Sequence, residues 1–174
     1  MPGALSGLCV PDFSTLLPGP MATLFLAEAG AEVIKIEKPN GGDEMRGYEP
    51  RWGDESANFN VLNRGKKSIV LDLKTDKGRA KLMPLIASAD IIVEQFRPGV
   101  MARLGLSYDY VRAIRPDIIY YSITGYGRSC PRALRAGHDL NFQGDVGLLS
   151  LSYGTPEAPV AAAKPVQTTG ELPG

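Results

Sequence analysis

Apolar residues in the first two thirds of the chain form short runs, separated by longer stretches in which they recur every three or four positions. The short runs are rich in β-branched residues, which is typical of buried strands, and the longer stretches indicate helices. The expected strands are 8–14, 31–37, 68–73, 90–94 and 118–123. The expected helices are 21–29, 76–87, 101–104 and 108–114, and Pro20 suits the first turn of the first helix.

This alternation of strands and helices predicts parallel strands joined by right-handed crossovers. The fold class is therefore α/β, a Rossmann-like, doubly wound and mostly parallel sheet with helices on both faces. Residues 38–62 carry several glycines and prolines without periodicity and are expected to form a long loop. We assign residues 1–150 to this lobe and residues 151–174, rich in Ala, Pro, Thr and Gly, to an extended or poorly ordered tail. Residues 147–151 could begin a helix.

Charge and composition narrow the possible partners. The 19 basic side chains balance the 19 acidic ones, which argues against a general affinity for nucleic acid or an anionic membrane. No apolar run is long enough to span a membrane and no secretory signal is evident, so we expect a cytoplasmic protein. Cys9 and Cys130 lie far apart without a CxxC spacing, and neither a disulfide framework nor a metal site is expected.

Candidate acid–base chemistry falls on His138, the only histidine of the chain. The alternative is a histidine that is merely hydrogen-bonded within the fold. Its neighbour Asp139 could orient the imidazole or cap a following helix. No GxGxxG or GxxxxGK[ST] pattern is present, so neither a dinucleotide nor a nucleoside triphosphate is indicated, and we expect ligands beyond the carboxyl ends of the strands.

Several stretches in sequence resemble the family III CoA-transferases, the CaiB/BaiF family, and most closely its α-methylacyl-CoA racemase branch. The stretches are LLPGPMAT (16–23), GAEVIKIEKP (30–39), NRGKKSIVLDLK (63–74), FRPGV (96–100), RLGL (103–106) and RAGHDLN (135–141). The resemblance covers the N-terminal part of the family's length. It implies coenzyme A, carried as a small-molecule acyl-CoA, as the ligand.

The resemblance also implies which residues contact CoA. Basic side chains can neutralise its phosphates, and Arg64, Lys66 and Lys67 are further candidates, with a solvated surface position as the alternative for the two lysines. The CoA-contacting positions that the resemblance implies are Lys38, Leu71, Leu73, Gln95, Phe96, Arg97, Arg103 and Gly137.

For the chemistry, the resemblance implies that His138 is one of two acid–base groups that exchange the α-proton of a 2-methylacyl-CoA, with Asp139 beside it. The family's second group is an aspartate about thirty residues further on, which in transferases forms an aspartyl-CoA intermediate. Residues 167–170 occupy that place and contain no aspartate, and Glu171 is the nearest carboxylate. A CoA-transferase and a non-catalytic CoA-binding fragment therefore remain alternatives to a racemase-like enzyme.

Family members are longer, carry a second, smaller domain and form interlocked dimers. The resemblance thus implies a truncated chain that lacks the small domain, and a homodimer for the full-length family.

Overall fold

The structure is a computed structural model that describes residues 3–148, 154–155 and 158–159 of the chain. Contacts divide it into two units with a boundary between Thr124 and Gly125. The strands are β1 (Cys9–Asp12), β2 (Glu32–Glu37), β3 (Arg51–Trp52), β4 (Glu55–Ser56), β5 (Lys67–Val70), β6 (Ile91–Glu94), β7 (Ile119–Ser122), β8 (Gly154–Thr155) and β9 (Ala158–Pro159). The helices are α1 (Pro18–Glu28), η1 (Glu44–Gly47), α2 (Ala57–Asn63), α3 (Asp76–Ser88), α4 (Val100–Arg103), α5 (Tyr108–Ile114) and α6 (Asp139–Asp145).

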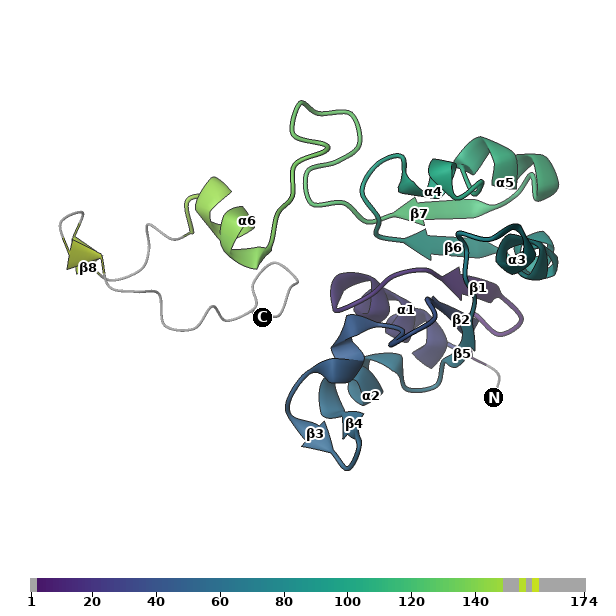
Figure 1. Ribbon diagram of the computed structural model, residues 1–174, viewed down its shortest axis with the longest axis horizontal. Coiled ribbons are helices and arrows are strands. Elements are labelled where there is room, and N and C mark those ends of the chain that lie inside the picture. The colour runs from purple at the N-terminus through teal and green to yellow at the C-terminus, as the bar shows by residue number, and fades with distance from the viewer. Residues whose placement is uncertain (1–2, 149–153, 156–157, 160–174) are drawn as a thin grey trace. The chain divides into compact units, whose positions relative to one another are not determined.

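The first unit is built on a five-stranded sheet with the order β5-β2-β1-β6-β7. Every neighbouring pair is parallel, with Val10 beside Val33 and Ile92 beside Tyr120 in the register. This confirms the predicted doubly wound α/β fold (Figure 1). The chain moves outward from β1 in one direction and then returns to its other side with β6. Ligands of such sheets bind at this reversal, beyond the carboxyl ends of the strands.

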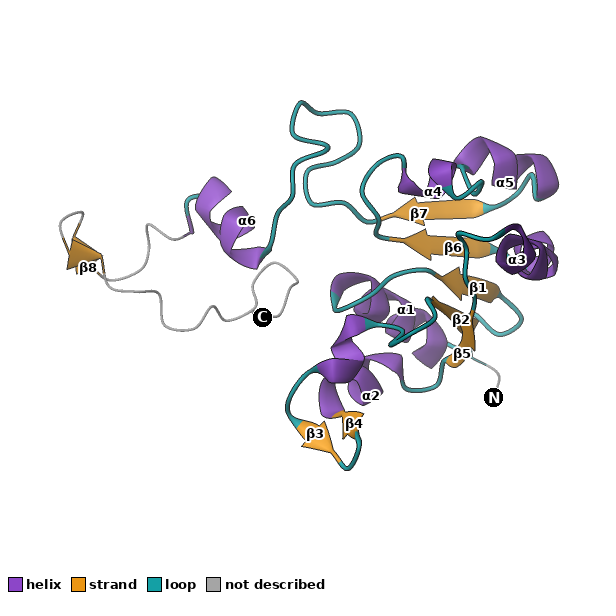
Figure 2. Cartoon of the chain, in the orientation of Figure 1, coloured by secondary structure: helices purple, strands orange, loops and turns teal. Residues whose placement is uncertain are grey.

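Successive strand residues point to opposite sides of the sheet, so apolar side chains lie on both faces. Helices cover both faces and bury these side chains. Val10, Val33 and Val93 form one buried cluster, against which α1 residues pack. Ile36 and Ile92 belong to the larger cluster on the other face, together with residues of α3, α4 and α5. Figure 2 shows α4 and α5 beside β6 and β7.

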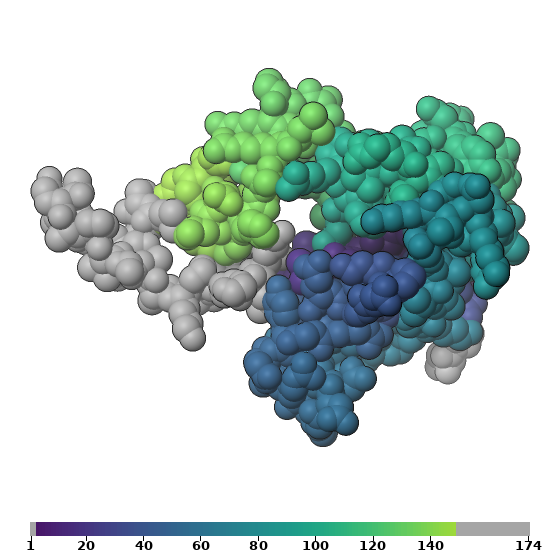
Figure 3. Space-filling view, viewed as in Figure 1, coloured from purple at the N-terminus to yellow at the C-terminus, as the bar shows by residue number. Residues whose placement is uncertain are grey.

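The expectation of a long loop over residues 38–62 is wrong in part. This segment contains η1, the antiparallel pair β3–β4 and α2, and it forms the blue part of the surface in Figure 3. The Oγ of Ser56 caps α2 by accepting a hydrogen bond from the N–H of Phe59 at 3.3 Å. Elements of two to seven residues are too short for hydrophobic periodicity to reveal.

In the second unit, α6 begins after His138 and packs its Phe142 ring against glycines. A Cβ atom at Gly125 or Gly137 would lie 2.4 or 2.8 Å from that ring, and the Tyr126 ring is 5.1 Å away between centroids. The predicted helix start at 147–151 lies partly outside the described residues, and Gly147 follows the end of α6. Most of the predicted 151–174 tail also lies outside them, apart from the short antiparallel pair β8–β9. None of the helices in the described ranges has the length and apolar character needed to cross a membrane.

Candidate functional site

A cavity of about 260 Å³ lies at the carboxyl ends of the sheet strands, within the first unit. Segments that follow β1, β2, β5 and β6 contribute to it, as the position of the chain reversal predicts. Its lining residues are Phe13, Thr15, Lys35, Ile36, Glu37, Lys38, Pro39, Gly42, Asp43, Leu71, Asp72, Leu73, Lys74, Phe96, Val100 and Leu104. An apolar wall with a few charged groups suits a ligand that has both an apolar and an anionic part.

Four of the CoA-contacting positions implied by the family resemblance line this cavity: Lys38, Leu71, Leu73 and Phe96. Arg97 and Arg103 are exposed and are not among its lining residues. Gln95 also lies outside the lining and is engaged within the chain, where its amide bonds the backbone of Thr15 and Gly19.

Sequence reasoning did not single out Thr15, Asp43 or Lys74 as site residues. Lys74 follows β5 by four positions, and its place beyond the carboxyl end of a parallel strand was the available signal. Asp43 gave no local signal, because only contacts with distant residues bring it to the cavity.

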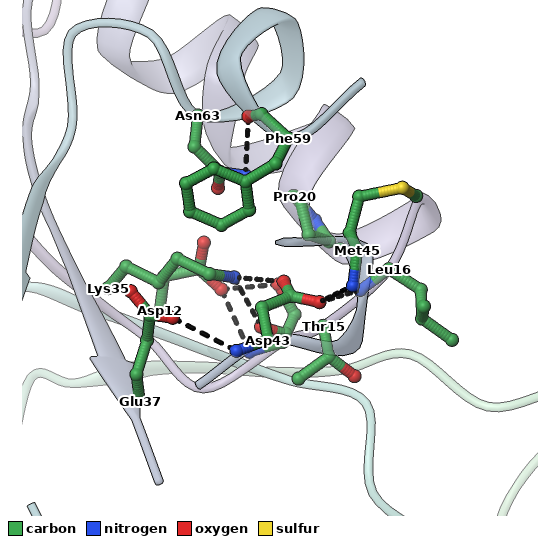
Figure 4. Close-up of polar contacts among 12 residues, drawn as sticks. Asp12, Thr15, Leu16, Pro20, Lys35, Glu37, Asp43, Met45, Phe59 and Asn63 are labelled. Atoms are coloured by element: carbon green, nitrogen blue, oxygen red, sulfur yellow. Dashed lines mark hydrogen bonds and ion pairs between the residues drawn. The ribbon is translucent and has the colours of Figure 1, made fainter. Parts of the chain in front are cut away.

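Lys35 and Asp43, which both line the cavity, form a buried ion pair (Figure 4). Lys35 Nζ lies 2.8 Å from Asp43 Oδ2, and both side chains are almost fully buried. The other carboxylate oxygen, Oδ1, accepts hydrogen bonds from the backbone N–H groups of Leu16 and Met45, each at 3.0 Å. Asp43 thereby joins the segment after β2 to the turn after β1.

Glu37, at the end of β2, is also buried and is held as a carboxylate. Arg46 donates to its two oxygens at 2.8 and 2.7 Å, and the N–H of Asp43 donates at 2.9 Å. Burial acts to raise the pKa of Glu37, but the hydrogen bonds from Arg46, Ser68 and the Asp43 N–H outweigh it and lower the pKa to about 2. The Arg46 guanidinium also lies 3.8 Å from the centre of the Phe59 ring, which ties α2 to the same cluster.

Lys66 is part of the internal structure and does not face solvent. Its Nζ donates to the carbonyl of Pro20 at 2.7 Å and to Thr23 at 2.8 Å, and lies 3.4 Å from Asp12 Oδ2. Burial lowers the pKa of Lys66 to about 8, although the Asp12 carboxylate acts in the opposite direction. Lys67, the next residue, is exposed and pairs with Glu32.

His138 and its neighbours belong to the second unit. His138 is exposed and is the N-cap residue of α6, and its backbone N–H donates to Asn141 Oδ1 at 2.9 Å. Asp139 is buried at the first helical position, and its carboxylate accepts a hydrogen bond from Gln143. A carboxylate there interacts favourably with the helix dipole. Gly137 packs against the Phe142 ring.

No group of three or more His, Cys, Asp or Glu side chains that could hold a metal ion occurs in the described part of the chain.

Comparison with known proteins decides the family. Residues 5–169 match CoA-transferase family III. The chain belongs to this family. It is 42% identical over 157 residues to the acetyl-CoA:oxalate CoA-transferase of Acetobacter aceti, and the matching region covers 90% of this chain and 40% of that relative. It is 41% identical over 149 residues to the human succinyl-CoA:glutarate CoA-transferase, which covers 85% of this chain and 34% of that relative.

Solved structures of family III CoA-transferase relatives have the same fold. A CAIB/BAIF family protein from Brucella suis matches 92% of this chain and 44% of its own at 37% identity, with a TM-score of 0.83. A hypothetical protein from Mycobacterium tuberculosis matches 95% of this chain and 46% of its own, also at 37% identity, with a TM-score of 0.85. The family III chain thus spans less than half the length of these relatives, which agrees with the predicted N-terminal resemblance.

Proposed function

We propose that the protein to which this chain contributes transfers coenzyme A from an acyl-CoA to a carboxylic acid, and that the cavity of the first unit binds CoA. The observation that carries the proposal is the cavity itself, where Lys38, Leu71, Leu73 and Phe96 come together at the carboxyl edge of the sheet. Arg97 and Arg103, both exposed, are proposed to bind the phosphates of CoA where the bound ligand extends out of the cavity.

The cavity has the chemical character that CoA requires. Leu71, Leu73 and Phe96 offer apolar and aromatic surface for the adenine ring and the pantetheine arm. Lys38 and Lys74 supply positive charge, and both are exposed to solvent. Of the carboxylates in the lining, Glu37 and Asp43 are neutralised by Arg46 and Lys35. The third, Asp72, is exposed and accepts a hydrogen bond from the backbone N–H of Lys74.

In the transfer, the thioester C–S bond of the donor breaks and a new C–S bond forms to the carboxyl carbon of the acceptor. A C–O bond of the acceptor carboxylate breaks at the same carbon, and its oxygen passes to the donor acyl group, which leaves as a carboxylate. A covalent route needs an enzyme carboxylate to attack the donor thioester. Its place by resemblance, residues 167–170, lies outside the described residues. We propose a dicarboxylic acid as acceptor, since the relatives above are named for oxalate and glutarate.

The racemase-like reaction is the second candidate. Its support is the Gly137-His138-Asp139 motif, in which His138 is exposed and could move a proton at the α-carbon of an acyl-CoA. The relatives reported above are named CoA-transferases, and these names support transfer more than racemisation.

Calorimetric titration of the 174-residue chain with CoA tests the binding site. We expect Phe96→Ala to weaken binding by about tenfold because it removes a stacking surface. Tyr110→Ala, an exposed aromatic on α5 that does not line the cavity, is the matched control and should bind as the parent does. Equal affinity of both variants would place CoA elsewhere.

A second assay separates the two reactions. Incubation with succinyl-CoA and oxalate or glutarate should yield the acceptor's CoA thioester, which mass spectrometry detects. Incorporation of α-deuterium into a 2-methylacyl-CoA in deuterated water, lost in His138→Ala, would instead support the racemase.

A further inference from the structure

The turn that follows β1 and leads into the first residues of α1, residues 14–19, adopts an unusual backbone conformation beside the cavity. Leu16 has a φ of 61°, in the left-handed region that side chains other than glycine rarely adopt. Such a conformation persists only where surrounding contacts impose it. Thr15, the preceding residue, lines the cavity, so the conformation of this turn sets part of the cavity wall.

Gln95 holds this turn at two points. Its Nε2 donates to the carbonyl oxygen of Thr15 at 2.6 Å, and its Oε1 accepts from the backbone N–H of Gly19 at 3.0 Å. One side-chain amide therefore bridges the two ends of the segment that contains Leu16. Gly19 fits closely: a Cβ atom there would lie 2.6 Å from Gln95 Oε1 and 2.1 Å from the Ser14 Cβ atom.

The two side chains of the buried ion pair, Lys35 and Asp43, also hold this turn. Lys35 Nζ donates to the carbonyl of Ser14 at 2.8 Å, and Asp43 Oδ1 accepts from the N–H of Leu16 at 3.0 Å. Figure 4 shows Asp43 directed toward Leu16 and Lys35. Lys35 and Asp43 also hold the segment after β2, so their removal would alter several parts of the cavity at once. Gln95 gives the more selective way to test the turn.

We propose that Gln95 is a positioning residue, which sets the affinity for CoA by fixing the 14–19 turn and not by contact with CoA. This rests on the proposed function in one respect, that CoA occupies the cavity. Both hydrogen-bonding ends of the Gln95 amide are already used within the chain, and the side chain is not among the lining residues.

Hydrogen–deuterium exchange of the 174-residue chain tests the hold on the turn without CoA. In Gln95→Leu, the Gly19 N–H loses its acceptor, and we expect its exchange to accelerate by about tenfold or more, as a lost hydrogen bond implies. The amides of Ile119–Ser122 in β7 should exchange at the parent rate. Gln95→Glu, which keeps an acceptor for Gly19 but sets an oxygen against the Thr15 carbonyl, should give a smaller change and serves if the leucine variant does not fold. Unchanged exchange at Gly19 in the folded variant would overturn the proposal.

CoA titration with a second-site substitution tests whether Gln95 acts through the turn. We expect Gln95→Leu to weaken CoA binding by about tenfold. Glycine adopts the left-handed region readily, so adding Leu16→Gly should recover at least half of this loss on a logarithmic scale. Phe96→Ala, which removes a lining side chain, is the control whose loss Leu16→Gly should not recover. A Gln95→Leu loss that Leu16→Gly leaves intact would show direct contact and overturn the proposal.

The failure of the two proposals can be told apart. If the parent chain does not bind CoA, the proposed site and the link from Gln95 to CoA are both overturned, while the exchange measurement still decides whether Gln95 holds the turn. If the parent binds CoA and Gln95→Leu binds equally well with a faster-exchanging Gly19, only the positioning role in CoA binding fails.

Discussion

Lys67, the first residue of β5, and Lys66, the residue before it, lie in opposite environments. The Lys66 side chain is 1% exposed and bonds Asp12, Thr23 and the Pro20 carbonyl, whereas Lys67 is exposed and pairs with Glu32 at the surface. From the sequence, a solvated surface position was the alternative to CoA binding for both lysines. Only Lys67 has such a position. The difference arises because successive residues of an extended chain point to opposite sides.

Lys66→Met should lower the free energy of unfolding by about 3 kcal/mol, because it leaves the buried Asp12 carboxylate without its ion-pair partner. Lys67→Met should leave the unfolding midpoint close to that of the parent, since surface ion pairs contribute little. Urea denaturation of both variants measures this. Adding Asp12→Asn to Lys66→Met removes the stranded charge and should recover part of the loss. Equal effects of the two lysine substitutions would contradict the buried assignment.

The Glu37 carboxylate gives a pH dependence with a defined sign. Its pKa is about 2 in the folded chain against an ordinary value of 4.5, so the folded state binds the proton less readily than the unfolded state. The stabilisation is therefore fully present above about pH 4.5 and is lost as the pH falls toward 2. A shift of this size corresponds to about 3 kcal/mol.

Measurement of the unfolding free energy by urea between pH 7 and pH 3 should show a steep acid loss in the parent, and a shallower one in Glu37→Gln. Glu44→Gln is the matched control: this residue is exposed and pairs only with Lys38 in the described structure, so its variant should follow the parent's pH curve. Parallel curves for the parent and Glu37→Gln would assign the acid sensitivity to other carboxylates.

At the scale of elements, the strands and longer helices of the first unit could be predicted from sequence because a parallel sheet buries continuous apolar runs. The segment between β2 and β5 could not, since its form depends on distant partners such as the ion pair from Lys35 to Asp43. Ser56 was a usable signal for α2, three residues before Phe59, whose N–H it caps. For α6 the signal was Asp139, expected as a cap of a following helix; the structure has that helix, but its N-cap is His138 and Asp139 is its first residue.

The site, too, could be predicted from the sequence only in part. Leu71 and Phe96 could be found from a family resemblance because they lie in recognisable stretches next to strands, and both line the cavity. The role of Gln95 toward the 14–19 turn could not, because its partners Thr15 and Gly19 are about eighty positions away in the chain.

The helix α6 and the loop before it depend on close packing of glycine against an aromatic ring. In Gly137→Ala the new Cβ would lie 2.8 Å from Phe142 ring carbons and 3.1 Å from Tyr126, so the ring must move. We expect the α6 amides to exchange faster in this variant, by about fivefold or more, because overpacking of this kind costs on the order of 1 kcal/mol.

Phe142→Leu in the same chain makes room for the added methyl group, and the double variant should exchange more slowly than the sum of the two single effects implies. Additive effects of the two substitutions would show that Gly137 and Phe142 do not restrict each other.

At the scale of the whole molecule, the division at Thr124 separates two kinds of residue. Both buried clusters and every residue that lines the cavity precede it, and the five-stranded sheet is complete at Ser122. His138 and Asp139 follow it. The stability of the sheet and the proposed hold on CoA are therefore attributed to the first unit, and the candidate acid–base group to the second.

A fragment that ends at Thr124 should unfold cooperatively in urea, with a midpoint close to that of the 174-residue chain, because it retains both buried clusters that stabilise the fold. It should also bind CoA within about threefold of the longer chain, since a change of that size is below 1 kcal/mol and no lining residue is lost. Circular dichroism and calorimetry measure the two properties. Cooperative unfolding with loss of CoA binding would mean that residues after Thr124, Gly137 foremost among those implied by the family resemblance, contact CoA directly. Loss of cooperativity would mean instead that the second unit contributes to the stability of the sheet.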